Sequence, residues 1–156
     1  MGTIQSFVAF FGRALLSLIF ISSAIHQLLD WEGAMQSFNQ ALTDRLTISV
    51  GNDFIQEVVE WSLAHAFSLL LAACIFELVG GVLVFLGLWV RLGALLLIFF
   101  LVPATLLFHN FWDVQGMDRQ MQMIHFMKNV SISGGLFFLL AIGKGKKLAK
   151  SHDKPI

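Results

Sequence analysis

Residues 63–90 read LAHAFSLLLAACIFELVGGVLVFLGLWV, an apolar run that contains a single carboxylate, Glu77. A helix needs about 20 apolar residues to cross the hydrocarbon core of a bilayer, and this run is long enough. Lipid offers no hydrogen-bond partners to the backbone, so a spanning segment is either helical or part of a closed barrel. The run lacks the alternating pattern of a barrel strand, and it therefore predicts a transmembrane helix.

Three further apolar runs cover residues 7–29, 92–111 and 124–142. Hydrophobic residues make up 57% of the chain and charged residues only 13%, against about 25% charged residues in a soluble domain. The sequence thus predicts an all-α, transmembrane four-helix bundle with spans at about 7–29, 63–90, 92–111 and 124–142, forming one domain over 1–156. We expect the lipid bilayer to be its main partner, and no nucleic acid.

The charges fall unevenly on the two sides of these spans. The tail over 143–156, together with Arg13 and Arg91, carries seven positive charges and one negative charge. The opposite side carries three positive and eight negative charges, and Glu77 within the membrane brings the total to zero. Because cytoplasmic segments are enriched in Lys and Arg, both chain ends are expected on the cytoplasmic side.

The loop over residues 30–62 is then extracytoplasmic. Ala34, Phe38 and Leu42 recur at spacings of four, which predicts a short amphipathic helix. Asp53 followed by Gln56 resembles a capping box and predicts the start of a second helix. We expect both pieces to lie over the outer mouth of the bundle.

Glu77 is the most informative polar residue. A carboxylate near the bilayer centre costs several kcal/mol unless it faces the bundle, gains a partner or is protonated. Ala73 and Gly81 share its helical face and allow a close neighbour, so Glu77 is expected to point inward. It either contacts a proton, ligand or quinone, or it fixes helix packing. Arg13 and Lys128 are candidate cations that could also snorkel to the interface, and we expect Arg13 to approach Glu77.

Four histidines fall at the predicted outer ends of four different spans: His26, His65, His109 and His125. Such a ring could bind a transition metal or relay protons. However, the spacing contains no compact metal motif, and histidine also suits membrane interfaces. We therefore assign no metal, and these four residues remain the candidates should one bind.

Small residues mark where helices can approach closely. Gly80 and Gly81 in the second span, and Gly134 and Gly135 in the fourth, are predicted helix-packing positions. Pro103 in the third span removes one backbone hydrogen bond and is expected to kink that helix.

The sequence resembles the DoxX family of small bacterial membrane proteins. The resemblance rests on motifs in a fixed order: GR at 12–13, FISSAIHQL at 20–28, ELVGG at 77–81, LGLWVR at 86–91, FHNFW at 108–112, HFMKN at 125–129 and GG at 134–135. It differs at Gln27, where many relatives have Lys after the histidine.

The resemblance implies a four-helix, multi-pass protein of the bacterial inner membrane. It also implies a link to membrane oxidoreductase complexes that handle thiol and oxidative stress. The candidate functional polar cluster taken from these motifs is Arg13, Glu77, His109, Asn110, Lys128 and Asn129.

No self-contained catalytic motif is present, and the chain has no thiol pair, haem motif or nucleotide fingerprint, so an electron carrier would belong to a partner. We favour a non-catalytic subunit or scaffold associated with a membrane redox system that uses thiols or quinone. No cofactor is identified from the sequence, and quinone is the one cofactor that could bind. The alternatives are a small transporter or proton-coupled permease, which could require a homo-oligomer, and a receptor for cargo or partner proteins.

Overall fold

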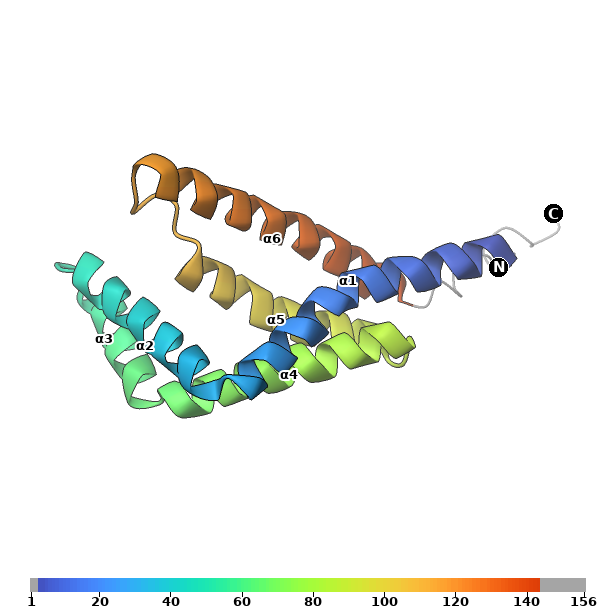
Figure 1. Ribbon diagram of the computed structural model, residues 1–156, viewed down its shortest axis with the longest axis horizontal. Helices are drawn as coiled ribbons and strands as arrows, with labels where there is room; N and C mark the ends of the chain where they lie inside the picture. The colour runs from blue at the N-terminus through green and yellow to red at the C-terminus, as the bar shows by residue number, and fades with distance from the viewer. Residues whose placement is uncertain (1–2, 144–156) are drawn as a thin grey trace, which may run out of the picture.

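The computed structural model describes residues 3–143, and within this range the chain folds into six α-helices and no strands (Figure 1). Their bounds are α1 Thr3–Leu29, α2 Trp31–Ile48, α3 Asp53–Ala64, α4 Ala66–Leu86, α5 Val90–Phe108 and α6 Gly116–Ile142. Among these, α1, α4, α5 and α6 are long and apolar enough to cross a membrane. The all-α class and the four predicted spans are confirmed.

The span limits differ from the predicted ones because backbone geometry, not hydropathy, ends each helix. The predicted second span is divided: α3 ends at Ala64, α4 begins at Ala66, and α4 stops at Leu86 because Gly87 adopts a φ of +68°. A left-handed residue in this position caps the helix C-terminus. The fourth span also begins earlier than predicted. Helix α6 starts at Gly116, and its first two turns contain Asp118, Arg119, Gln120 and Gln122, which a hydropathy criterion leaves out.

The four long helices form an open arrangement. Helix α4 packs against both α1 and α5, and α6 packs on the other side of α5 (Figure 1). The core lies where these contacts meet, and its buried members are Phe20, Val84, Ala94, Leu97, Leu101 and Leu136. Helices α1 and α6 meet near Leu16 and Gly135, and they leave a space between them toward the end covered by α2.

Helix α4 approaches its two neighbours through adjacent glycines. A Cβ placed on Gly80 would lie 2.9 Å from Leu97 Cγ and 3.0 Å from the Gly93 carbonyl oxygen of α5. A Cβ on Gly81 would lie 2.9 Å from Ile21 Cγ1 of α1. Both positions therefore require a residue without a side chain, as in other membrane helix contacts.

The glycines of α6 are placed differently. Nothing lies within 4 Å of a Cβ built on Gly134, and Gly135 has only ordinary contacts with Leu16 at 3.6 Å. The predicted close-packing role of Gly134 is therefore wrong, and that of Gly135 is weak. Small residues in a membrane helix indicate a close approach only when the neighbouring helix lies on their side.

The loop over 30–62 consists of α2 and α3, as the spacing predicted. Asp30 caps α2 by accepting from the Gly33 amide at 3.1 Å. For α3 the capping residue is Asn52, which accepts from the Ile55 amide at 3.2 Å. The predicted capping box at Asp53 is thus wrong by one residue, because the Asn52 side chain takes the cap and Asp53 already belongs to the first turn.

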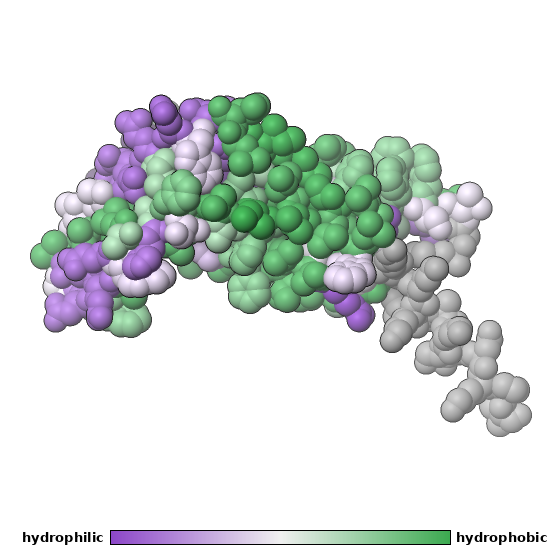
Figure 2. Space-filling model, turned by 90° about the horizontal axis from the view of Figure 1, so that it is seen from below, coloured by the Kyte–Doolittle hydropathy of each residue, from purple (hydrophilic) through white to green (hydrophobic). Residues whose placement is uncertain are grey.

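The two short helices sit at one end of the bundle, where α2 packs on α1, α4 and α5 (Figure 1). Hydrophilic residues gather at that end, and a broad hydrophobic surface covers the middle of the molecule (Figure 2). Many large apolar side chains on this surface are exposed, among them Leu15, Phe67, Phe99 and Phe137. Contact of such a surface with lipid is favourable, whereas its contact with water is not. The chain is therefore a membrane protein in contact with the bilayer.

Replacing Gly80 with alanine should lower stability by about 1–3 kcal/mol, because the added methyl overpacks the α4–α5 contact. Gly134→Ala is the matched control and should lose no stability, since a methyl group has free space there and alanine is more favourable than glycine in a helix by about 0.5–1 kcal/mol.

Cys74 is the single cysteine of the chain and is 2% exposed. Thermal unfolding can therefore be followed with a thiol-reactive fluorescent dye, and equal midpoints for the two variants would contradict the packing assignment.

Candidate functional site

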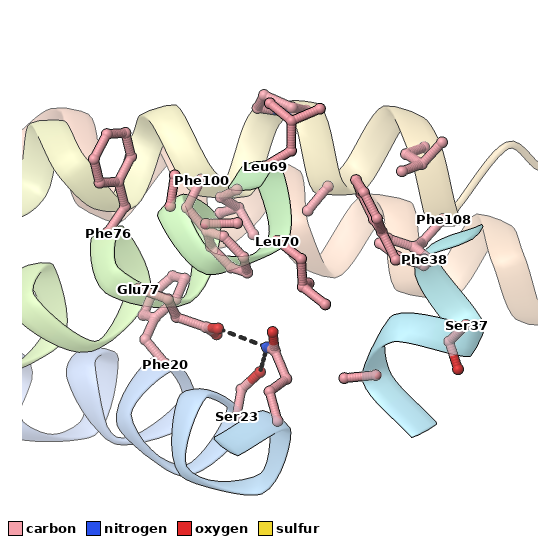
Figure 3. A pocket seen from close by; sticks show the side chains of 18 of the residues that line it. Phe20, Ser23, Ser37, Phe38, Leu69, Leu70, Phe76, Glu77, Phe100 and Phe108 are labelled. Carbon is pink, nitrogen blue, oxygen red and sulfur yellow. Dashed lines mark hydrogen bonds between the residues drawn. The ribbon is translucent and has the colours of Figure 1, made fainter. Parts of the chain in front are cut away.

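A cavity of about 970 Å³ lies between the four long helices, at the end of the bundle covered by α2. Six phenylalanines contribute to its walls, together with aliphatic and polar side chains: Phe20, Phe38, Phe76, Phe99, Phe100 and Phe108. Figure 3 shows several of these rings around the space, with Phe38 and Ser37 contributed by α2. The volume is at the upper end of the range of ligand pockets, about 300–1,000 Å³.

Glu77 projects from the middle of α4 into this cavity, and it is 1% exposed. Its Oε2 accepts a hydrogen bond from Gln27 Nε2 at 2.8 Å, and the same nitrogen donates to Ser23 Oγ at 3.1 Å (Figure 3). Ser23 and Gln27 are four residues apart and therefore share one face of α1. The carboxyl group is thus held by a neutral amide that a second side chain orients.

The predicted pairing of Arg13 with Glu77 is wrong. The Arg13 guanidinium lies against the turn between α4 and α5, where its Nη2 is 3.1 Å from the position of a Cβ on Gly87. Ser23 is ten residues further along α1, or about 15 Å at 1.5 Å per residue. The sequence placed both groups inside the membrane, but it did not indicate which turn of α1 faces which turn of α4.

A second polar group lines the cavity from α5 and α6. His109 follows the last residue of α5, and its Nδ1 is 2.9 Å from Gln122 Oε1. Its ring stacks on His125 with centroids 5.2 Å apart. Burial lowers the pKa of His109, and the nearby charges of His125 and Lys128 lower it further, while the bond to Gln122 acts in the opposite direction. The neutral imidazole is therefore favoured.

Beside it, Lys128 lines the cavity from α6. Asn129 is buried and donates to Thr105 Oγ1 at 3.0 Å, which ties α6 to α5 at this depth. Of the predicted polar cluster, the cavity thus brings together Glu77, His109, Lys128 and Asn129. Arg13 is at the other end of the bundle, and Asn110 instead donates to Asp113 at 2.9 Å.

The predicted histidine ring is only partly assembled. His26 lines the cavity, and His109 and His125 lie together, but His65 stacks on Trp61 with centroids 4.5 Å apart. Within residues 3–143, no three His, Cys, Asp or Glu side chains are grouped closely enough to hold a metal ion. Helix ends at equal depth do not bring side chains together when the helices are spread out.

Helix α2 is fastened over the cavity by one arginine. Arg45 Nη1 pairs with Asp113 Oδ2 at 2.7 Å, Nη2 donates to the Leu106 carbonyl at 2.5 Å, and the guanidinium lies 5.8 Å from the centre of the Trp112 ring. These contacts join α2 to the end of α5 and the segment after it. The cavity is therefore closed on the α2 side by a held helix.

Gln27 and Ser23 are site residues that sequence reasoning missed. The available signal was their spacing, since two polar side chains four apart in an otherwise apolar helix share one face. In the sequence, Gln27 stands out only as a departure from relatives that have Lys. The structure places it directly against the buried carboxyl group.

The sequence model of the DoxX family matches residues 8–110, which include most of α1 and all of α2 to α5. The chain belongs to the DoxX family. This DoxX protein is also similar to a protein of Escherichia coli K12 named "Inner membrane protein YphA", with 36% identity over 73 residues. That match covers 47% of this chain and 52% of the relative, so it spans about half the length of each protein. No solved structure matches the chain.

We expect Gln27→Leu to destabilise this DoxX protein by about 1–3 kcal/mol, because a buried acceptor on Glu77 loses its donor. The double variant Gln27→Leu/Glu77→Leu should be less destabilised than the sum of the two single variants, since neither partner is then left unsatisfied.

The matched control is Gln40→Leu, which removes an exposed glutamine that donates to Asp44 at 2.8 Å. It should change stability by no more than about 0.5 kcal/mol. Unfolding midpoints in detergent measure all four variants, and strictly additive losses at Gln27 and Glu77 would show that the two side chains are not coupled.

Proposed function

We propose that this chain is a non-catalytic membrane subunit that binds a lipid-soluble quinone and presents it to a partner oxidoreductase. The observation that carries the proposal is the aromatic cavity with polar groups on two walls. A quinone is a flat apolar ring with oxygen atoms at its edge and an apolar tail. It would be recognised by aromatic contacts and a small number of well-placed hydrogen-bonding groups.

The residues that line the cavity fit such a ligand. Phe76, Phe99 and Phe100 supply the aromatic walls. The Lys128 ammonium is a hydrogen-bond donor. The neutral imidazole of His109 donates from Nδ1 to the Gln122 amide oxygen, which leaves Nε2 as a hydrogen-bond acceptor. Both amide hydrogens of Gln27 are used by Glu77 and Ser23, so its part is to orient the carboxyl group.

The chain's own residues would bind, orient and exchange protons. Lys128 would donate a hydrogen bond to an oxygen atom at one edge of the quinone ring. His109 Nε2 and Glu77, on opposite walls, would accept hydrogen bonds or protons from the hydroxyl groups of the reduced form. A bound quinone supplies the two-electron chemistry, and the partner protein supplies the electrons. Helix α2, held by Arg45, would exclude water from the cavity on that side.

An inner-membrane location is supported by the name of the Escherichia coli relative and by the four apolar helices. The start of α1 and the end of α6 lie at the same end of the bundle (Figure 1). Arg13 and Arg91 lie toward this end, while the acidic residues of α2 and α3 lie at the other. The lysines of the tail over 143–156 fall outside the described residues. This distribution supports cytoplasmic chain ends.

Fusion reporters test the orientation. Green fluorescent protein joined after Ile156 should fluoresce, and alkaline phosphatase joined there should be inactive, because the C-terminus is cytoplasmic. Alkaline phosphatase inserted between Val50 and Gly51, in the turn between α2 and α3, should be active. The opposite pattern would reverse the orientation.

The quinone proposal predicts that lipid extracts of the gently purified protein contain quinone, and that decyl-ubiquinone quenches tryptophan fluorescence with saturation. Lys128→Met should weaken binding by about tenfold, as expected for loss of a hydrogen bond to a charged group. Arg119→Met removes a charge from the same helix outside the cavity lining and should bind as the unaltered protein does.

Ala73→Phe is a second test, since Ala73 lines the cavity and the larger ring would occupy it. Loss of binding in this variant is expected. Absence of any saturable quenching, or full binding by both Lys128→Met and Ala73→Phe, would contradict a quinone site in this cavity.

A further inference from the structure

At the end of the bundle away from the cavity, Arg13 lies in the angle between α1 and the turn that joins α4 to α5. Its Nη2, Cζ and Nε atoms are 3.1, 3.3 and 3.5 Å from the position of a Cβ on Gly87. We propose that Arg13 and this turn form a binding site for the phosphate group of an anionic phospholipid. The site is separate from the cavity and does not depend on the proposed quinone function.

The first observation is an unsatisfied donor. Arg13 Nε is buried and has no hydrogen-bond partner among residues 3–143, and it is the one buried side-chain nitrogen or oxygen in that range without a partner. Buried polar groups in folded proteins almost always have hydrogen-bond partners, and a buried donor without one costs about 1–3 kcal/mol. The terminal nitrogens Nη1 and Nη2 also have no hydrogen bond within this range and are not buried, so an acceptor from outside the chain can bind the guanidinium through them.

The second observation is that Arg13 is not needed to cap α4. An arginine beside a helix C-terminus commonly bonds the last carbonyl oxygens. Here the Gly87 amide donates to the Val84 carbonyl at 3.1 Å, and the Leu88 amide donates to the Leu83 carbonyl at 2.9 Å. The helix end is closed by its own backbone, so the guanidinium remains available for another acceptor.

The third observation concerns charge. Every acidic residue between 3 and 143, apart from Glu77 in the middle of α4, lies on α2, α3 or α6 or in the loops beside them, toward the cavity end. The other described cation here, Arg91, donates to the Ala141 carbonyl at 2.9 Å. The described part of this end thus holds two guanidinium groups and no carboxylate, which favours an anion.

The surroundings of Arg13 select a lipid over a free anion. Phe10, Leu86 and Trp89 are exposed around this end of the bundle, and Phe10 contacts Phe85 with ring centroids 6.3 Å apart. Exposed tryptophan is typical of the membrane interface. A phosphate that carries acyl chains can place its charge on Arg13 and its chains on these apolar side chains, which a free phosphate ion cannot do.

Native mass spectrometry of the full-length protein tests the proposal, with phosphatidylglycerol and phosphatidylcholine titrated in the same detergent. The unaltered protein should bind phosphatidylglycerol more tightly. Arg13→Gln should reduce that preference roughly fivefold, the value of one basic residue at a membrane surface. Arg119→Gln removes the same charge at the opposite end and should keep the preference.

Arg13→Lys keeps the charge but loses the planar fork that bonds two phosphate oxygens. It should show an intermediate preference, and it decides the question if Arg13→Gln does not fold. Inorganic phosphate at millimolar concentration should not displace phosphatidylglycerol. An unchanged preference in Arg13→Gln or in Arg13→Lys would overturn the proposal, and so would displacement by inorganic phosphate, which would indicate a free-anion site.

Discussion

Lipid tails offer no hydrogen bonds, and most of this structure follows from that constraint. Each spanning segment satisfies its own backbone by forming a helix. Polar side chains in the spans are subject to the same requirement, and several of them find partners within the protein, although Arg13 Nε has none among residues 3–143. Glu77 meets Gln27, Asn129 meets Thr105, and Ser17 turns back to the Arg13 carbonyl oxygen. The Ser17 bond lies within α1, whereas the Glu77–Gln27 and Asn129–Thr105 pairs join different helices. These two pairs fix the relative rotation of helices that apolar contacts alone would leave loosely defined.

Close packing and open space are divided between different parts of the bundle. The α4 glycines bring α1 and α5 against α4, which produces a dense core around Leu97 and Val84. Helix α6 rests on α5 and leaves the cavity between itself and α1. A membrane protein can maintain such a space because α2 covers one end, and because lipid or a lipid-like ligand is the natural occupant of an apolar cavity. The same division separates the proposed quinone site from the proposed phospholipid site, which lies where the helices are tightly packed.

Much of the architecture could be predicted from the amino-acid sequence. Apolar run length identified four spans, and spacing identified two short helices between the first and second of them. The family motifs led to the DoxX family, which the match over residues 8–110 confirms. Helix limits were less accurate, since the end of α4 depends on the backbone conformation of Gly87 and the start of α6 lies in polar sequence. Local hydrogen bonding sets these limits, and hydropathy does not record it.

The sequence by itself determined that this chain spans a membrane in four helices, because the need to bury long apolar runs in lipid depends on composition and length alone. It also placed a carboxylate at mid-membrane on a face with small residues. Only the tertiary structure decided the partner of each polar group. Glu77 pairs with Gln27 and not with Arg13, and Asn110 bonds Asp113 and does not enter the cavity. Arg13 lies against the α4–α5 turn. The physical reason is that depth in the membrane can be counted along a helix, whereas the rotation of a helix and its offset against a neighbour arise from packing between residues far apart in the chain.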